Sequence, residues 1–61
     1  MRIFFIGDIV GKPGRRILSE NLPRIREALG IDFAIANAEN AAGGNGITKN
    51  MAEELFRAGI D

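Results

Sequence analysis

Two short apolar runs, separated by a segment with helical periodicity, set the pattern of this chain. Residues 3–6 and 33–36 are rich in isoleucine and phenylalanine and do not alternate with polar residues, which is typical of strands buried on both faces. We expect strands over residues 2–7 and 32–36, and a helix over residues 15–29 between them. A strand, a helix and a strand in this order indicate a βαβ unit with parallel strands.

The expected first helix contains a proline. Pro23 lacks an N–H group and its ring clashes with the preceding turn, so we expect the helix to be kinked or split there. Residues 8–14, with two glycines and a proline, are expected to form a loop before it, and Gly30 suits its carboxyl end. Its apolar face would consist of Ile17, Leu18, Leu22, Ile25, Ala28 and Leu29.

A second helix is expected after a long loop over residues 37–47. Thr48 is a suitable N-cap, the helix would run to Ala58, and Gly59 would stop it. Its apolar face would consist of Met51, Ala52, Leu55 and Phe56. Residues 59–61 then look like the start of a third strand. The predicted fold class is therefore α/β, with βαβα order.

Length and composition add one conclusion, which concerns the size of the domain. The chain has 61 residues, 46% of them apolar, with no cysteine and no histidine to build a disulfide or a zinc site. Two helices cannot cover both faces and both edges of a buried parallel sheet. We therefore expect residues 1–61 to be the N-terminal fragment of a single larger domain.

Charge and the amino-terminal segment give little evidence of a macromolecular partner. Eight basic and eight acidic residues leave a net charge of zero, which gives no strong attraction for nucleic acid or a membrane surface. The apolar run after Met1 and Arg2 is too short for a signal peptide or a membrane span, so a cytoplasmic location is the default expectation.

Each predicted strand leads into a carboxylate. Asp8 follows the first strand and Glu39 follows the second, and parallel strands end at the same edge of a sheet, where open α/β sheets bind ligands. Two close carboxylates repel each other unless a positive charge lies between them, and a metal ion would supply it. Asn40 could ligate the metal or hydrogen-bond a phosphoryl oxygen. The plainer alternatives are a turn-forming Asp8 and an Asx-turn at Asn40.

Two further features could bind an anion. The loop Gly43–Gly44–Asn45–Gly46 could present N–H groups to a phosphate, although a flexible loop is the simpler interpretation. Lys12 could contact a phosphate, whereas Arg15 and Arg16 are more often solvated surface residues. A P-loop is excluded, because three residues instead of four separate Gly7 from Gly11 and no Ser or Thr follows the lysine. The Rossmann glycine pattern is also absent after the first strand.

Three segments together resemble a known family. Residues 7–15 (Gly-Asp-Ile-Val-Gly-Lys-Pro-Gly-Arg), 37–44 (Asn-Ala-Glu-Asn-Ala-Ala-Gly-Gly) and 46–48 (Gly-Ile-Thr) are similar to the YmdB-type metallophosphoesterases of the calcineurin-like phosphoesterase superfamily. The similarity covers essentially the whole chain. It implies the N-terminal portion of a four-layer α/β sandwich, with Val10 at the position where the wider superfamily has a histidine.

The resemblance also implies a chemistry. It indicates a two-metal phosphodiesterase acting on 2′,3′-cyclic nucleotides or related small phosphodiesters through an activated hydroxide, with Fe, Mn, Mg or Zn as the metals. Asp8 matches the first metal ligand, Glu39 the bridging carboxylate, and Asn40 the residue that orients the phosphoryl group or the nucleophile. The family's later histidine ligands have no counterpart here, so the isolated chain is expected to be inactive.

Two other hypotheses remain at the level of the sequence. The chain could be a non-catalytic, flavodoxin-like module that binds an anion or a nucleotide through the loop at residues 43–46. It could also be a small scaffold that self-associates into a homo-oligomer through its exposed strand edges.

Overall fold

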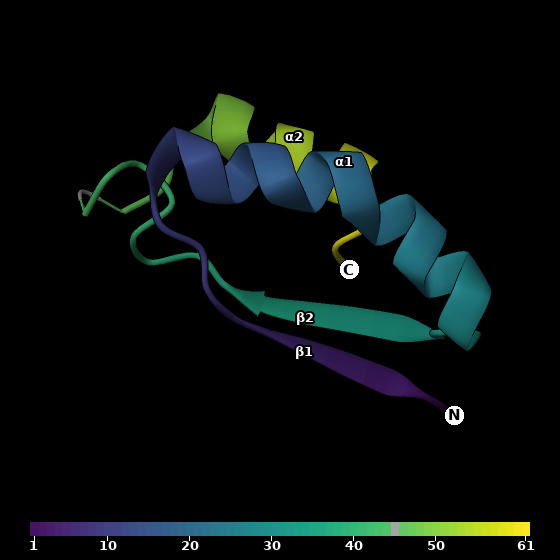
Figure 1. Ribbon diagram of the computed structural model, residues 1–61. Coiled ribbons are helices and arrows are strands. Elements are labelled where there is room, and N and C mark those ends of the chain that lie inside the picture. Colours follow the sequence, from purple (N-terminus) through teal and green to yellow (C-terminus); the bar gives the residue numbers. More distant parts are fainter. Residues whose placement is uncertain (45) are drawn as a thin grey trace.

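The computed structural model describes residues 1–44 and 46–61 and contains four elements in chain order. These are β1 (Ile3–Asp8), α1 (Gly11–Leu29), β2 (Phe33–Asn37) and α2 (Lys49–Ala58). The strands pair in parallel, and both helices lie on the same side of the sheet that they form (Figure 1). The predicted α/β class, element order and parallel pairing are confirmed. Within the described residues, neither helix combines the length and the apolar character that a membrane crossing requires.

The strands end one residue later than predicted. Asp8 is therefore the last residue of β1, and Asn37 is the last residue of β2. The register runs regularly from Ile3 opposite Phe33 to Ile6 opposite Ala36 and then shifts, so that Asp8 lies opposite Asn37. The shift is a bulge at Gly7, a feature that re-aims side chains at the ends of strands. It brings the carboxylate of β1 level with the polar end of β2.

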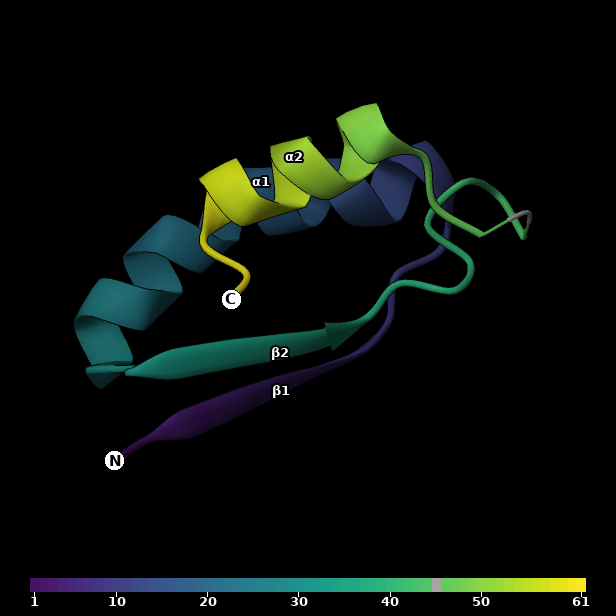
Figure 2. The same cartoon turned by 180° about the vertical axis from the view of Figure 1, so that it is seen from behind.

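Only one face of the sheet is covered in the described residues, so burial on both faces is not observed. Both helices pack on the face that carries Ile6 and Ala36, which adjoin the core (Figure 2). On the other face, the side chains of Ile3 and Phe5 are 61% and 68% exposed. The two helices of the chain are both used on the first face, which leaves these residues in contact with solvent.

Helix α1 begins four residues earlier than predicted. The segment from Gly11 to Gly14 was expected to be a loop, but Gly14 N–H already donates to Val10 O over 3.3 Å. Pro13 fits here because N–H groups in the first turn of a helix have no partner within the helix. Gly11 has a φ of +62°, and its N–H donates to Asn40 O over 3.1 Å. The chain thus enters the helix through a left-handed glycine.

Pro23 bends α1 without splitting it. The helix is continuous to Leu29, and its last turns descend towards the start of β2 (Figures 1 and 2). Leu22 is buried as predicted, whereas Ile17 and Leu29 are exposed, as is Ala28. The prediction that these three side chains belong to the buried face is wrong. The side of α1 that faces α2 is narrower than the spacing of its apolar residues indicated.

The predicted start of α2 and the predicted carboxyl ends of both helices are confirmed. Thr48 caps α2, with its Oγ1 accepting from Met51 N–H over 3.2 Å. Gly30 and Gly59 follow α1 and α2, both with positive φ. Within α2, Leu55 is buried, but Phe56 is mostly exposed, contrary to prediction. The buried core consists of Ile9, Leu22, Ile31, Ala34, Ala41, Leu55 and Ala58.

Arg26 ties the end of α1 to the end of α2. Its guanidinium donates to Gly59 O and, over 2.7 Å, to the carboxylate of Asp61. Asp61 also bonds the free edge of β2, donating its N–H to Ala34 O and accepting from Ala34 N–H, each over 2.9 Å. The first bond joins two backbone groups and the second uses Asp61 Oδ2, so the third strand expected at residues 59–61 is not formed in the described residues. The hydrogen bond from Ala34, together with Arg26, lowers the pKa of Asp61 below its ordinary value of 3.8.

The lowered pKa gives a pH-dependent contribution to stability. The Asp61 carboxylate should stabilise the fold fully above its unfolded pKa, and this contribution should fade as pH falls through the lower folded value. In the full-length protein, Asp61→Asn should therefore lower the free energy of unfolding near neutral pH, and the difference from wild type should shrink below about pH 3.8. Urea unfolding of both proteins across this range measures it. A difference that stays constant with pH would contradict the prediction.

Gly11→Ala should destabilise the protein because an L-residue is strained at positive φ. The expected loss of unfolding free energy is about 1–2 kcal/mol, measured by urea unfolding of the full-length protein. Gly7→Ala is the matched control, since Gly7 is not at positive φ and a Cβ there meets no atom within 4 Å among the described residues. Its effect should stay within about 0.5 kcal/mol. Equal effects of the two substitutions would show that backbone strain does not matter at Gly11.

Candidate functional site

The candidate site is built on a tight turn directly after β2. Ala41 N–H donates to Ala38 O over 3.1 Å, which places Glu39 and Asn40 at the two central positions of the turn. Ala41 is completely buried against Ile9 and Leu55, and Ala38 packs at the edge of this cluster. The small apolar residues anchor the turn in the core. The two polar residues between them are thereby held at the carboxyl edge of the sheet.

Asn40 meets Asp8 across this edge. The Nδ2 group of Asn40 donates to both carboxylate oxygens of Asp8, over 3.1 and 3.0 Å, although 32 residues separate them. The backbone contributes a second link, since Ile9 N–H donates to Asn37 O over 3.0 Å. The carboxylate of Asp8 at the end of β1 and the amide of Asn40 in the turn after β2 therefore face each other. The βαβ interpretation predicted that the two strands end at one edge, but it paired Asp8 with Glu39 there.

Glu39 is oriented by Asn37. The Oδ1 atom of Asn37 accepts from Glu39 N–H over 3.1 Å, and its Nδ2 group lies 3.4 Å from Glu39 Oε1. The Asx-type turn considered for Asn40 is therefore made by Asn37 instead. Glu39 lies at the same edge of the sheet as Asp8, and its side chain is exposed. Its hydrogen bond to Asn37 leaves the other carboxylate oxygen, Oε2, available to a ligand.

The donor set has the chemistry of a divalent-cation site but is incomplete within this chain. Asp8, Glu39 and Asn40 offer carboxylate and amide oxygens, which suit Mg²⁺ or Mn²⁺. No group of three or more His, Cys, Asp or Glu side chains suited to a metal occurs in the described part of the chain. The described residues therefore fit only part of the ligand set that such a site would need.

Two N–H groups of the glycine-rich loop are hydrogen-bonded within the chain. Gly43 N–H and Gly44 N–H both donate to Asn40 O, over 3.1 and 3.3 Å. The phosphate-binding role considered for this loop would need these donors to be free. Asn45, which belonged to the same proposal, lies outside the described residues. The hydrogen bonds instead make the loop a support for the turn that carries Asn40.

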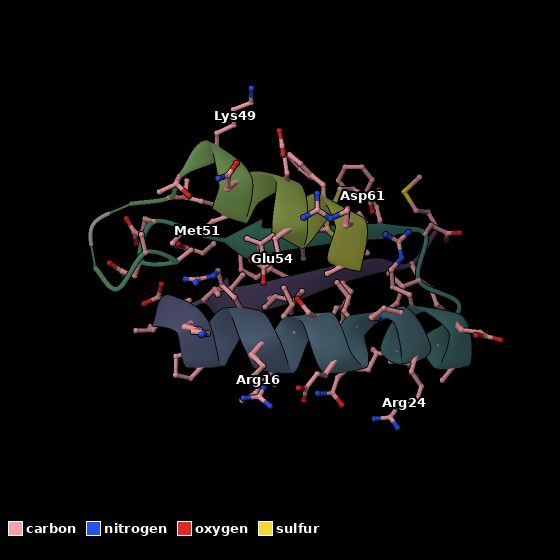
Figure 3. The ribbon with its side chains drawn as sticks, turned by 90° about the horizontal axis from the view of Figure 1, so that it is seen from above. Arg16, Arg24, Lys49, Met51, Glu54 and Asp61 are labelled. Carbon is pink, nitrogen blue, oxygen red and sulfur yellow. The ribbon has the colours of Figure 1, made fainter. Side chains whose placement is uncertain are left out.

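The three basic residues near the start of α1 have different environments. Lys12 and Arg16 are exposed, and Figure 3 shows Arg16 pointing away from α2. The expectation that Arg15 is a solvated surface residue is wrong. Its side chain is only 12% exposed, and its Nη1 donates to Ala41 O over 2.5 Å. The prediction failed because it made Arg15 the first residue of the helix and left it out of the apolar face, so Arg15 was not assigned to the inner side of the helix.

Two residues that orient the site were not identified from the sequence. Arg15 lies three and seven positions before Leu18 and Leu22, so this helical spacing is the signal that places it on the inner stripe of α1. Asn37 precedes Glu39 by two residues, the spacing of an Asx-turn, which is a recognisable local signal.

Comparison with protein families and known proteins gives a consistent result. The family model described as "YmdB-like protein" matches residues 4–61. All 61 residues align with the 2′,3′-cyclic-nucleotide 2′-phosphodiesterase of Bacillus subtilis (strain 168) at 44% identity, covering 23% of that protein. They also align at 43% identity with a protein of Mycoplasma genitalium named as a phosphatase/phosphodiesterase, covering 22% of it. The chain thus spans less than a quarter of the length of these relatives.

Solved structures agree with the fold. A crystal structure of a hypothetical protein from Thermus thermophilus superposes on the whole chain with a TM-score of 0.91 at 44% identity, over 23% of its own length. A crystal structure described as a novel phosphatase, from Mycoplasma pneumoniae, also gives a TM-score of 0.91, at 38% identity, over 95% of this chain and 21% of its own.

Proposed function

The chain belongs to the YmdB-like protein family, and we propose that it forms the N-terminal part of a metal-dependent phosphodiesterase domain. The proposed substrates are 2′,3′-cyclic nucleotides or related small phosphodiesters, the class named for the relative from Bacillus subtilis. The observation that carries the proposal is the contact between Asp8 and Asn40. It joins the two sequence motifs at the carboxyl edge of the parallel strands.

In the proposed site, Asp8 and Glu39 would hold two divalent cations, and Asn40 lies beside Asp8. Such a metal pair supplies Lewis-acid polarisation of the phosphoryl oxygen and a nucleophile at neutral pH. The carboxylates of this chain would offset the positive charge of the cations and fix their positions. The Asn40 amide would bind and orient the phosphodiester group, which requires it to be held rigidly.

The start of α1 contributes positioning more than chemistry. Gly11 N–H donates to Asn40 O, which fixes the turn relative to the helix. Lys12 is exposed in the same segment and could contact the substrate only at its periphery. We therefore assign the binding of the metals to Glu39 and Asp8. Lys12 is assigned at most a peripheral contact with the substrate.

In the full-length enzyme, Glu39→Gln should damage catalysis far more than Lys12→Ala. The first substitution would remove a carboxylate proposed to hold the metal ions, whereas the second removes at most one charged contact, of about 1.5–3 kcal/mol. Values of kcat/KM with 2′,3′-cyclic AMP, together with the metal content of each purified variant, measure the difference. If Glu39→Gln keeps both metals and near-normal turnover, the assignment of Glu39 as a ligand is wrong.

The isolated 61-residue chain should show no phosphodiesterase activity. It supplies only part of the proposed ligand set and contains no histidine. The measurement is hydrolysis of bis-para-nitrophenyl phosphate in the presence of Mn²⁺, compared with the metal alone. Turnover that exceeds this blank and persists through a second purification would show that residues 1–61 already contain a working site.

A further inference from the structure

Arg15 joins three parts of the molecule that meet behind the candidate site. It extends from the first turns of α1, donates from Nη1 to Ala41 O in the turn, and approaches Glu54 of α2, with 3.8 Å between Nε and Oε2. Figure 3 shows Glu54 on the side of α2 that faces α1. The side chain of Arg15 is 12% exposed and that of Glu54 is 42% exposed, so only the Arg15 end of this bridge is largely shielded from water.

The acceptor of this hydrogen bond is the carbonyl group next to Asn40 in the chain. The Asn40 carbonyl accepts from Gly11 N–H and the Ala41 carbonyl accepts from Arg15, so consecutive carbonyls of the turn are both held by the start of α1. The side chain of Asn40 meanwhile contacts Asp8. Any movement of the Asn40–Ala41 backbone would therefore change the separation between the Asn40 amide and the Asp8 carboxylate.

The burial of a positive charge at this point indicates a role beyond packing. Arg15 Nε is buried and has no hydrogen-bond partner among the described residues, and Glu54 is too distant to supply one. An incompletely paired buried guanidinium lowers stability, and an apolar side chain would fill the same space at lower cost. Conversely, a planar guanidinium can reach a carbonyl and a carboxylate in different directions at once.

We propose that Arg15 is a positioning residue, which holds the turn at Glu39 and Asn40 in the geometry that binds the metal ions. This inference rests on the proposed function. Arg15 acts through Ala41 O and does not itself contact the metals or the substrate. Groups that orient ligands from behind typically change metal affinity by about 10- to 100-fold when they are removed.

The test uses the full-length enzyme, stripped of metal, and its Arg15→Met variant, in which the apolar stem is kept and the hydrogen bond is lost. Isothermal titration with Mn²⁺ alone should show affinity about 10- to 100-fold weaker than that of the wild type. Circular dichroism and urea unfolding establish that the titrated protein is folded. Arg16→Met is the matched control, because Arg16 is exposed and pairs only with Glu20 on its own helix among the described residues. Its Mn²⁺ affinity should equal that of the wild type.

A second variant keeps the test decisive if Arg15→Met does not fold. Arg15→Gln retains a polar group but is too short to reach Ala41 O, and it should weaken Mn²⁺ binding in the same way. Wild-type affinity in a folded Arg15 variant would overturn the positioning role while leaving the proposed function intact. A wild-type enzyme that neither binds Mn²⁺ nor hydrolyses a phosphodiester would instead overturn the proposed function itself.

Discussion

The parallel pairing of β1 and β2 is the constraint on which the rest of the structure depends. Parallel strands require a crossover, and α1 provides it within the segment that separates Asp8 from Phe33. The same pairing brings the ends of both strands to one edge, where Asp8 lies opposite Asn37. The backbone pairing of the strands thus makes neighbours of polar residues that are far apart in the chain. The contact between Asp8 and Asn40 follows from this arrangement.

The polar site lies at the surface because its neighbours in the chain pack towards the core, Ala41 fully buried and Ala38 partly buried. Ala38 and Ala41 flank Glu39 and Asn40, and both pack against the cluster that contains Ile9 and Leu55. Alanine suits these positions because it is apolar and small enough for the turn to lie close to the helices. A larger side chain at Ala41, which has no exposed surface, would have to displace core residues, at a cost of about 1–3 kcal/mol. In this segment, the packing of the core therefore determines the geometry of the site.

Local signals predicted the element types well and their boundaries less well. Thr48 caps the start of α2, and Gly30 and Gly59 cap the carboxyl ends of α1 and α2. All three act through hydrogen bonds within a few residues, so their roles could be predicted from the sequence. The loop predicted over residues 8–14 extends too far, because Pro13 lies in the first turn of α1, where a proline is compatible with a helix. The general placement of Asp8 and Asn40 followed from strand topology. The role of Arg15 could not be predicted, because its acceptor lies 26 residues away and depends on how a turn packs against a helix.

On the proposed function, the exposed apolar face and the incomplete ligand set have the same physical origin. A parallel sheet is normally covered on both faces, yet Ile3 and Phe5 remain exposed on the side opposite the helices. Likewise, a metal pair needs more ligands than Asp8, Glu39 and Asn40 can offer. The relatives are more than four times as long as this chain, which is length enough to supply both a covering layer and further ligands. The helices on the first face leave the carboxyl edge of the sheet free, so a layer added to the second face could bring its ligands to Asp8 without disturbing the turn that Arg15 holds.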